Sequence, residues 1–420
     1  MKKTLDQKLH ERKIKKPNYI IYNFLGHLWK YTVAKKYKMN VNFIDDPKKE
    51  KGAYILISNH ASRLDYIFTA VPLLPQTLNF VAGYNEFFRS HLHTIFHLLQ
   101  EIPKKNFTPD MYTVLEIFRI IKSGGRVVLF PEGMSSISGG SQPVALGSGK
   151  LLKKLNVPVY VSSIKGGYLV SPKYNLIERP GKVEVSYKKL FSVDDLSRLD
   201  ADEIQDILNK EIQTNDYLYN ETAKNIYKTN EVMKNIEQLL YKCPVCGAEF
   251  ENESGNNYLV CKKCHNKVEM DNSYALSAVN GKLPFKNPKD WFDYEREEVK
   301  KEIQDPEFYL EDEVEIGFLP KYEYLKNLKT SEIEGNGVLR IDHKGIHFQG
   351  IRNNEPYEVE FNLLETPTYG MCTDASRFYT FYKGEFIEFY PKRLSTIKWL
   401  LVTEELHRLH NGKWKNYNDW

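Results

Sequence analysis

The sequence lacks a long apolar run. Its longest N-terminal apolar stretch, residues 17–29, has 13 residues between two lysines, whereas a membrane-spanning helix needs about 20. A second stretch, residues 66–85, is interrupted by two prolines and by polar side chains. We therefore expect no transmembrane span. The start of the chain also has no small-residue cleavage site after its apolar stretch, so we expect no secretory signal and a cytoplasmic location.

Cysteine is scarce as well, with five in 420 residues. Four of them form two CxxC pairs, Cys243 with Cys246 and Cys261 with Cys264. Without a signal peptide, this spacing indicates metal binding rather than disulfides, although redox cysteines are an alternative. Four thiolates suit a tetrahedral Zn²⁺ ion and leave no open position, so the expected site is structural. His265 is a competing ligand, and the module over residues 240–275 resembles a zinc ribbon.

Charge is distributed unevenly along the chain. The net charge is +4, but residues 1–51 hold 14 lysines and arginines against five acidic residues. Such a basic end indicates an anionic partner, either a membrane or a nucleic acid. Residues 17–38 interleave aromatic residues with lysines, as helices in the bilayer interface do, with Tyr19, Phe24 and Trp29 expected at headgroup depth. We expect a membrane-surface segment over residues 1–40; a basic helix packed on its own domain is the alternative.

Short β-rich runs alternate with helical patterns after residue 52. The runs cover residues 53–57, 77–82, 126–130, 157–164 and 181–187. This alternation predicts an α/β domain over residues 41–235, with a mixed sheet flanked by helices. Residues 192–241 have the pattern of polar helices.

The last part of the sequence is β-rich. Five predicted strands between residues 338 and 390 precede a helical pattern over residues 395–410. Strands closed by one helix resemble the architecture of pleckstrin-homology-like domains. We expect such a domain over residues 285–420.

The first motif with chemical meaning follows the first predicted strand, where residues 59–65 read Asn-His-Ala-Ser-Arg-Leu-Asp. His60 and Asp65 can meet if the histidine lies on the turn and the aspartate in the first helical turn. An imidazole held in one tautomer by a carboxylate is a general base. Ser62 and Asp65 also have the spacing of a helix capping box, which is the structural alternative.

The second motif, Phe-Pro-Glu-Gly at residues 130–133, follows another predicted strand. Polar residues at the carboxyl ends of strands form the binding sites of α/β folds, so Glu132 and Gly133 are candidate site residues. The alternative is a turn set by the proline and the glycine.

Together and in this order, the two motifs resemble those of the lysophospholipid acyltransferase family, which includes the 1-acylglycerol-3-phosphate acyltransferases. The resemblance covers roughly residues 20–190. It implies that His60 deprotonates the acceptor hydroxyl, that Asp65 orients the histidine, and that Asn59, Glu132 and Gly133 contribute to the acceptor site. The donor implied is acyl-CoA or acyl carrier protein, and no cofactor is consumed.

Three departures from the family pattern concern the acceptor. Residues 134–136 read Met-Ser-Ser where the family has Thr-Arg-Ser, so the arginine expected at the acceptor phosphate is absent. The middle block offers Lys104 and Lys105 instead of an arginine, and a lysine lacks the bidentate guanidinium fork. Val161 replaces the second proline of the last block.

The sequence therefore predicts a peripheral acyltransferase of phospholipid biosynthesis on the inner face of the cell membrane. Its expected acceptor is a lysophospholipid, 1-acylglycerol 3-phosphate first of all, with Lys104 or Lys105 at the phosphate. A lipid acceptor without phosphate and a non-catalytic membrane adaptor are the alternatives. Zinc ribbons also bind nucleic acid, but the aromatic, basic N-terminal segment favours lipid, and no nucleic-acid partner is expected.

Overall fold

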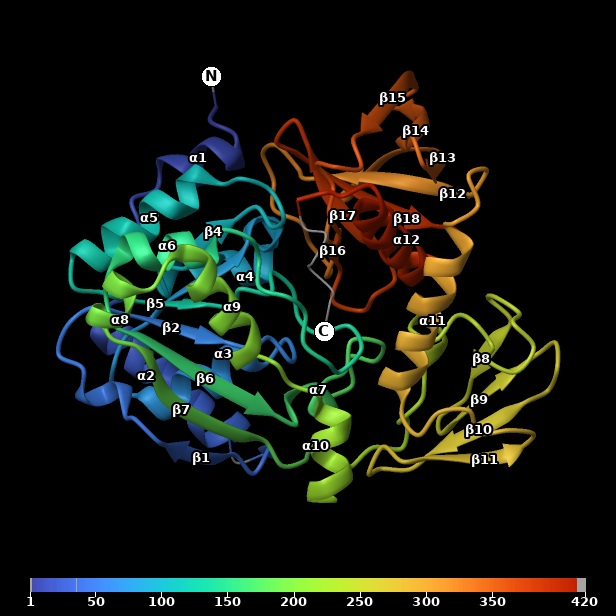
Figure 1. The fold of residues 1–420 in the computed structure, drawn as a ribbon. Helices are drawn as coiled ribbons and strands as arrows, with labels where there is room; N and C mark the ends of the chain where they lie inside the picture. Colours follow the sequence, from blue (N-terminus) through green and yellow to red (C-terminus); the bar gives the residue numbers. More distant parts are fainter. Residues whose placement is uncertain (1, 35, 414–420) are drawn as a thin grey trace.

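The computed structural model describes residues 2–34 and 36–413. It contains an α/β domain, a unit around the four paired cysteines and a β-rich C-terminal domain (Figure 1). We call the second the cysteine unit (residues 243–280) and the third the β domain (residues 309–409). None of the described helices combines the length and the apolar character that crossing a bilayer requires.

The α/β domain is built on a mixed sheet of seven described strands. In spatial order they are β1 (Asn40–Phe43), β7 (Glu184–Phe191), β6 (Val159–Lys165), β2 (Tyr54–Ser58), β5 (Arg126–Leu129), β3 (Asn79–Gly83) and β4 (Ile102–Lys104). The strands from β6 to β4 pair in parallel, and β7 runs antiparallel to β6. The carboxyl ends of five strands therefore meet at one edge. The five predicted runs correspond to β2, β3, β5, β6 and β7, whereas the short β1 and β4 were missed.

Both faces of this sheet are covered, as the burial of every residue of β2 indicates. Side chains alternate along β2, so Tyr54 and Leu56 belong to one apolar cluster and Ile55 and Ile57 to another. The first cluster includes residues of α2 (Tyr19–Trp29) and α3 (Asp65–Ala70). The second includes residues of α5 (Met111–Lys122), α6 (Ser148–Leu155) and α9 (Ala201–Glu211). The predicted mixed sheet flanked by helices is confirmed.

The N-terminal segment does not stand apart from the α/β domain. Helix α1 (Leu5–Glu11), helix α2 and the π-helical turn η1 (Lys30–Ala34) run along it. Ile14 belongs to the second apolar cluster and Tyr22 to the first. The expected boundary at residue 40 is therefore not observed, because buried side chains tie this segment to the core.

The region expected to hold polar helices is only partly helical. Helices α8 (Val193–Arg198), α9 and α10 (Asp216–Ala223) end before residue 224, and the 3-10 turn η5 (Ile236–Gln238) is the next helical element. Tyr227, Val232 and Met233 are buried in this stretch. It is therefore a packed connector, and its apolar side chains fix an irregular path.

The cysteine unit is a four-stranded antiparallel sheet in the order β11-β10-β9-β8. Its strands are β8 (Asn252–Ser254), β9 (Tyr258–Cys261), β10 (Lys267–Met270) and β11 (Leu276–Asn280). The unit thus extends beyond the expected boundary at residue 275. Helix α11 (Pro288–Glu302) connects the cysteine unit to the β domain. The indole N–H of Trp291 in this helix donates to the carbonyl of Lys242, the residue before the cysteine unit, at 2.8 Å.

The β domain is an antiparallel sheet of seven strands within the described chain, closed by α12 (Thr396–Leu409). The order is β15 (Glu355–Phe361), β14 (Gly345–Arg352), β13 (Glu332–Asp342), β12 (Tyr309–Phe318), β18 (Glu385–Pro391), β17 (Phe378–Tyr382) and β16 (Gly370–Met371). The predicted terminal helix is confirmed, and it is almost completely buried.

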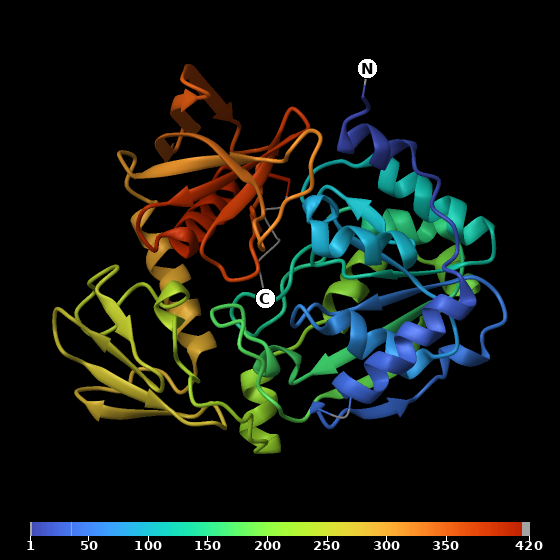
Figure 2. The same cartoon turned by 180° about the vertical axis from the view of Figure 1, so that it is seen from behind.

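The β domain lies beside the carboxyl edge of the α/β sheet (Figures 1 and 2). Leu325 forms two backbone hydrogen bonds with residues after β3, from its N–H to Phe88 at 2.8 Å and from the N–H of Ser90 to its carbonyl at 2.9 Å. The Lys105 ammonium donates to the carbonyl of Gly384 at 2.9 Å. Residues at this edge therefore have the β domain as a neighbour.

Candidate functional site

His60 and Asp65 meet at the carboxyl end of β2. The strand ends at Ser58 and α3 begins at Asp65, so the histidine lies on the turn between them. Nδ1 of His60 donates to Oδ2 of Asp65 at 2.9 Å. The predicted pairing across the turn is confirmed. The alternative, a capping box with Ser62 as N-cap, is not formed, because Leu64 is the N-cap of α3. The Ser62 hydroxyl instead donates to the Asp65 carboxylate at 3.1 Å.

The surroundings of this pair fix the imidazole. Asp65 is 0% exposed, and its burial raises the pKa of its carboxyl group. The hydrogen bond from His60 acts in the opposite direction and lowers this pKa. The Nδ1–H bond leaves Nε2 as the proton acceptor of the ring. The ring stacks on Phe130 with centroids 4.5 Å apart, and no described residue bonds to Nε2. The pair can act as a general base.

Glu132 holds the backbone of His60 in place through a hydrogen bond. It follows β5, is 1% exposed, and accepts the backbone N–H groups of His60 and Gln142, each at 2.6 Å. Burial raises the pKa of Glu132 to about 8, although the two N–H groups oppose this shift. Glu132 was expected at the acceptor; the structure instead places both its oxygens in backbone hydrogen bonds.

Gly133 has φ of +79°, a conformation that favours glycine. A Cβ atom there would lie 3.0 Å from the ring of Phe107. Its role is therefore to let the chain turn close to that ring.

Asn59 is also a buried support. Its side-chain amide donates to the carbonyl of Ile164 at 2.9 Å and accepts the N–H of Ile164 at 2.7 Å. These bonds tie the end of β2 to β6. Asn59, like Glu132, was expected at the acceptor and is instead enclosed by protein.

The two lysines of the middle block lie at the end of β4, away from the cleft beside His60. Burial lowers the pKa of Lys104. The Lys105 ammonium lies over the Tyr84 ring, 4.9 Å from its centroid, and contacts the β17–β18 turn. Neither side chain lines the cleft described next.

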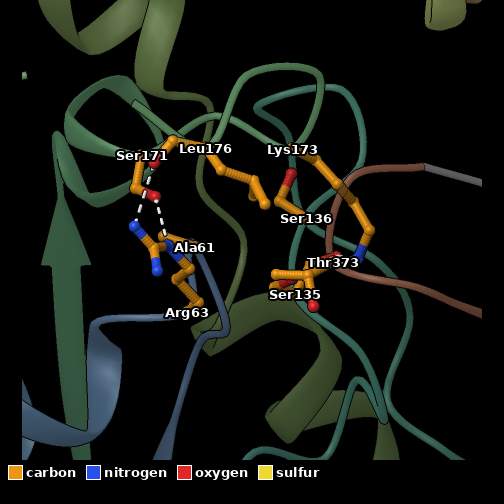
Figure 3. A pocket seen from close by; sticks show the side chains of 8 residues that line it. All are labelled: Ala61, Arg63, Ser135, Ser136, Ser171, Lys173, Leu176 and Thr373. Atoms are coloured by element: carbon orange, nitrogen blue, oxygen red, sulfur yellow. Dashed lines mark hydrogen bonds between the residues drawn. The ribbon is translucent and has the colours of Figure 1, made fainter. Parts of the chain in front are cut away.

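A narrow cleft is lined by Ala61, the residue after His60, and the two cations of the cleft were missed by the sequence reasoning (Figure 3). Its lining residues are Ala61, Arg63, Ser135, Ser136, Ser171, Lys173, Leu176 and Thr373. The N–H of Ser136 donates to the carbonyl of His60 at 2.7 Å, which joins the cleft to the histidine. Thr373 comes from the β domain, so residues far apart in sequence form this site. Arg63 lies inside the histidine motif, which was a usable signal, whereas no pattern marked Lys173.

The two cations flank this cleft from opposite sides (Figure 3). Arg63 donates from Nε to the Ser171 hydroxyl at 3.1 Å and pairs with Glu178 at 3.1 Å. Lys173 is 5% exposed and donates to the Ser135 hydroxyl at 3.1 Å, and it has no ion pair with any described carboxylate. Burial lowers the pKa of Lys173 to about 8. The nearby Asp374 carboxylate acts against this shift but forms no ion pair with Lys173. A buried ammonium without a paired carboxylate is costly, and an anion in the cleft would compensate it.

The four paired cysteines converge in the cysteine unit. Their sulfurs all lie within 4.8 Å of one another. The distances are 3.7 Å from Cys243 to Cys264 and 3.8 Å from Cys246 to Cys261. Among the described residues this cluster contains cysteines alone, so His265 is not part of it. The four thiols could hold a metal ion. Cys372, by contrast, is a buried free cysteine of the β domain.

Comparison with known proteins bears on the α/β domain. Residues 40–165 match the model of the family described as Acyltransferase. Among solved structures, the 1-acyl-sn-glycerophosphate (LPA) acyltransferase PlsC from Thermotoga maritima is similar at 17% sequence identity and a TM-score of 0.37, over 49% of this chain and 94% of that chain. No match is found among curated proteins. The matched residues include His60, Asp65, Glu132 and Gly133, so residues 40–165 of the α/β domain are similar to that family.

Proposed function

We propose that this protein transfers a fatty acyl group from a thioester, acyl-CoA or acyl carrier protein, to the hydroxyl of a lysophospholipid. The observation that carries the proposal is the His60–Asp65 pair at the carboxyl edge of an acyltransferase-family domain. A non-catalytic adaptor would have no need of a buried carboxylate holding a histidine whose second nitrogen is free.

The proposed reaction uses the free Nε2 of His60. Nε2 takes the proton of the acceptor hydroxyl while the oxygen attacks the thioester carbonyl carbon. The C–S bond then breaks, and the leaving thiolate takes the proton from the imidazolium, so the products are an ester and a free thiol. Asp65 stabilises the imidazolium and keeps Nδ1 protonated. Asn59, Glu132 and Gly133 act as positioning residues that fix the turn carrying His60.

The cleft of Arg63 and Lys173 supports an acceptor with a phosphate group. Two cations and several hydroxyls suit a phosphate, and the cleft begins one residue from the general base. These side chains would take the place of the arginine that residues 134–136 lack. Lys104 and Lys105 are less suited, since neither side chain lines this cleft. 1-Acylglycerol 3-phosphate is the simplest acceptor of this kind.

An exposed apolar stripe on α2 and the following turn η1 supports binding to a lipid surface. Ile20, Phe24, Leu28 and Tyr31 follow at helical spacing and are between 50% and 77% exposed. Trp29 points the other way, and its ring packs against Tyr66 with centroids 5.6 Å apart. The proposed membrane contact is therefore this stripe with the lysines near it, not the whole segment 1–40.

Zinc is the proposed occupant of the cysteine cluster. With Zn–S bonds of about 2.3 Å, tetrahedral geometry sets sulfurs about 3.8 Å apart. The distances of 3.7 and 3.8 Å in two of the sulfur pairs fit that value. Such an ion would stabilise the fold of the cysteine unit and take no part in acyl transfer.

The test is an acyl-transfer assay with purified full-length protein. Isotope-labelled palmitoyl-CoA and palmitoyl carrier protein are supplied separately with lysophosphatidate, lysophosphatidylcholine or monoacylglycerol, and products are identified by mass spectrometry. We expect diacylated phospholipid and free thiol in equal amounts. Transfer to monoacylglycerol alone would indicate the acceptor without phosphate, and no product from any pair would favour the adaptor.

A further inference from the structure

A second, larger cavity is a neighbour of the cleft beside His60. It has a volume of about 410 Å³ and is lined by Tyr174, Asn175, Leu176, Ile177, Lys234, Asn235, Gln238 and Asp374. Leu176 lines both spaces, and Thr373 of the cleft is followed by Asp374 of the cavity. The two spaces are therefore neighbours, and a ligand that occupies both has to pass Leu176.

Three parts of the chain form this cavity. Residues 174–177 come from the α/β domain, residues 234–238 from the packed connector, and Asp374 from the β domain. All three lie outside residues 40–165, which match the acyltransferase family model. The cavity is thus a feature of this chain beyond its matched domain.

The cavity offers polar groups that are not used inside the protein. Within the described chain, the side-chain amides of Asn235 and Gln238 have no hydrogen-bond partner, and Oε1 of Gln238 is buried. Asp374 accepts from Cys372 and Ser376 through Oδ1, which also pairs with Arg377 at 3.5 Å, and keeps Oδ2 free of such bonds. Amides and a carboxylate supply both donors and acceptors, the combination that hydroxyl groups require.

Tyr174, Leu176 and Ile177 give the lining an apolar side, but its polar side chains still disfavour an acyl chain. It would cover two unpaired amides, the ammonium of Lys234 and a carboxylate oxygen with hydrocarbon, and each buried polar group without a partner costs free energy. A second phosphate is disfavoured by the Asp374 carboxylate. An uncharged, hydroxyl-rich group satisfies the lining best.

From these observations we infer that the acceptor is a lysophospholipid with a hydroxyl-rich head group, such as a polyol or a sugar, esterified to its phosphate. The phosphate lies between Arg63 and Lys173, and the head group occupies the cavity with its hydroxyls bonded to Asn235 and Gln238. This inference rests on the proposed function and narrows its acceptor from any lysophospholipid to one class. It also gives the connector and the β domain a role in substrate selection.

Binding of deacylated head groups tests the inference independently of turnover. Calorimetry on the full-length protein would compare glycerophosphoinositol with glycerophosphocholine, whose head group has no hydroxyls, and with glycerol 3-phosphate. We expect glycerophosphoinositol to bind at least about tenfold more tightly than either, which corresponds to about 1.4 kcal/mol. Equal affinities for all three would overturn the inference.

Two double variants localise this preference. Asn235 has φ of +66°, so Asn235→Gly removes its amide without backbone strain, and Gln238→Ala removes the other. The matched control is Asn354→Gly with Gln349→Ala. Both residues are exposed in the β domain, and Asn354 has φ of +67°. We expect the first double variant to lose the preference for glycerophosphoinositol and the control to keep it. A preference unchanged in the first variant would overturn the inference.

A competition assay separates this inference from the proposed function. With palmitoyl-CoA and equal amounts of lysophosphatidylinositol, lysophosphatidylcholine and lysophosphatidate, we expect lysophosphatidylinositol to be acylated fastest. If no acceptor is acylated but glycerophosphoinositol still binds preferentially, acyl transfer fails and the head-group site stands. If all three are acylated equally, acyl transfer stands and the head-group inference is wrong.

Discussion

The carboxylate of Glu132 accepts the backbone N–H of His60 at 2.6 Å. Two motifs that are about 70 residues apart in the sequence are thereby joined by a buried hydrogen bond. The second oxygen of Glu132 accepts the N–H of Gln142, so the same side chain also fixes the loop after β5. The position of His60, the proposed general base, thus depends on a buried side chain whose two oxygens are taken by backbone N–H groups.

Replacing Glu132 by glutamine tests this dependence. An amide has only one acceptor oxygen, so one of the two backbone N–H groups would face an NH₂ group and lose its bond. We expect Glu132→Gln to lower the free energy of unfolding by about 1–3 kcal/mol, as for other unpaired buried groups, and to lower kcat. Urea unfolding and turnover assays measure both, with Glu323→Gln as the exposed control. A fully stable, fully active variant would show that the bond is dispensable.

The pH dependence of this variant has a defined sign. Burial raises the pKa of Glu132 to about 8, so its contribution to stability is complete below its ordinary pKa and is lost as the pH rises towards 8. The glutamine does not titrate. We therefore expect the stability difference between wild type and Glu132→Gln to shrink from pH 5 to pH 8. A difference that grows over this range would mean that the two N–H groups outweigh burial.

Lys173 should control the affinity for a phosphorylated acceptor. We expect Lys173→Met to raise KM for lysophosphatidate at least about tenfold and to leave KM for monoacylglycerol unchanged, the pattern of lost ground-state binding. Since burial lowers the pKa of Lys173 to about 8, wild-type kcat/KM for lysophosphatidate should also fall above that pH, and this fall should vanish in the variant. Lys344→Met, in an exposed turn, is the control. An unchanged acceptor preference would remove Lys173 from the phosphate site.

The cysteine cluster should contain one zinc ion per chain. Cys243→Ser or Cys261→Ser should release it and destabilise the cysteine unit, because metal binding and folding are coupled in such modules. Metal analysis by mass spectrometry and limited proteolysis measure the two effects. Cys372→Ser, which alters a cysteine outside the cluster, should keep the metal. Metal-free purified protein with four freely titratable thiols in the cluster would refute the site.

The stripe on α2 should carry the membrane contact. We expect Phe24→Ser with Leu28→Ser to weaken sedimentation with phosphatidylglycerol vesicles, most clearly at high salt, where the lysines are screened. Folding should be preserved, because both side chains point away from the core. Ile333→Ser with Ile351→Ser removes comparable exposed side chains from the β domain and should have no effect. Equal loss in both variants would argue against a specific membrane face.

The sequence predicted elements best where periodicity and motif agreed. The runs at β2 and β5 and the His60–Asp65 pairing were found because apolar strands end directly in polar motifs. Strand β4 is only three residues long and contains a proline, so no alternation could mark it. Residues 224–241 look polar in composition, but their few apolar side chains are buried in an irregular path.

The roles of individual side chains were harder to predict. A motif specifies that Glu132 is near the histidine, but not that both its oxygens are taken by backbone N–H groups. Trp29 was expected in the membrane because aromatic residues and lysines alternate around it, whereas its helical phase turns it towards Tyr66. Lys173 and Thr373 meet in the same cleft only through the packing of the β domain on the α/β domain, which no local pattern encodes.

The most direct test of the central claim is the turnover of His60→Ala and Asp65→Asn with an acyl thioester and a lysophospholipid. We predict a loss of at least about 10²-fold in kcat for His60→Ala, a marked loss for Asp65→Asn because the tautomer is no longer enforced, and unchanged metal content in both. His91→Ala, an exposed histidine of α4 (Ser90–Leu98), should retain full activity. Turnover near the wild-type rate in both site variants would contradict the account.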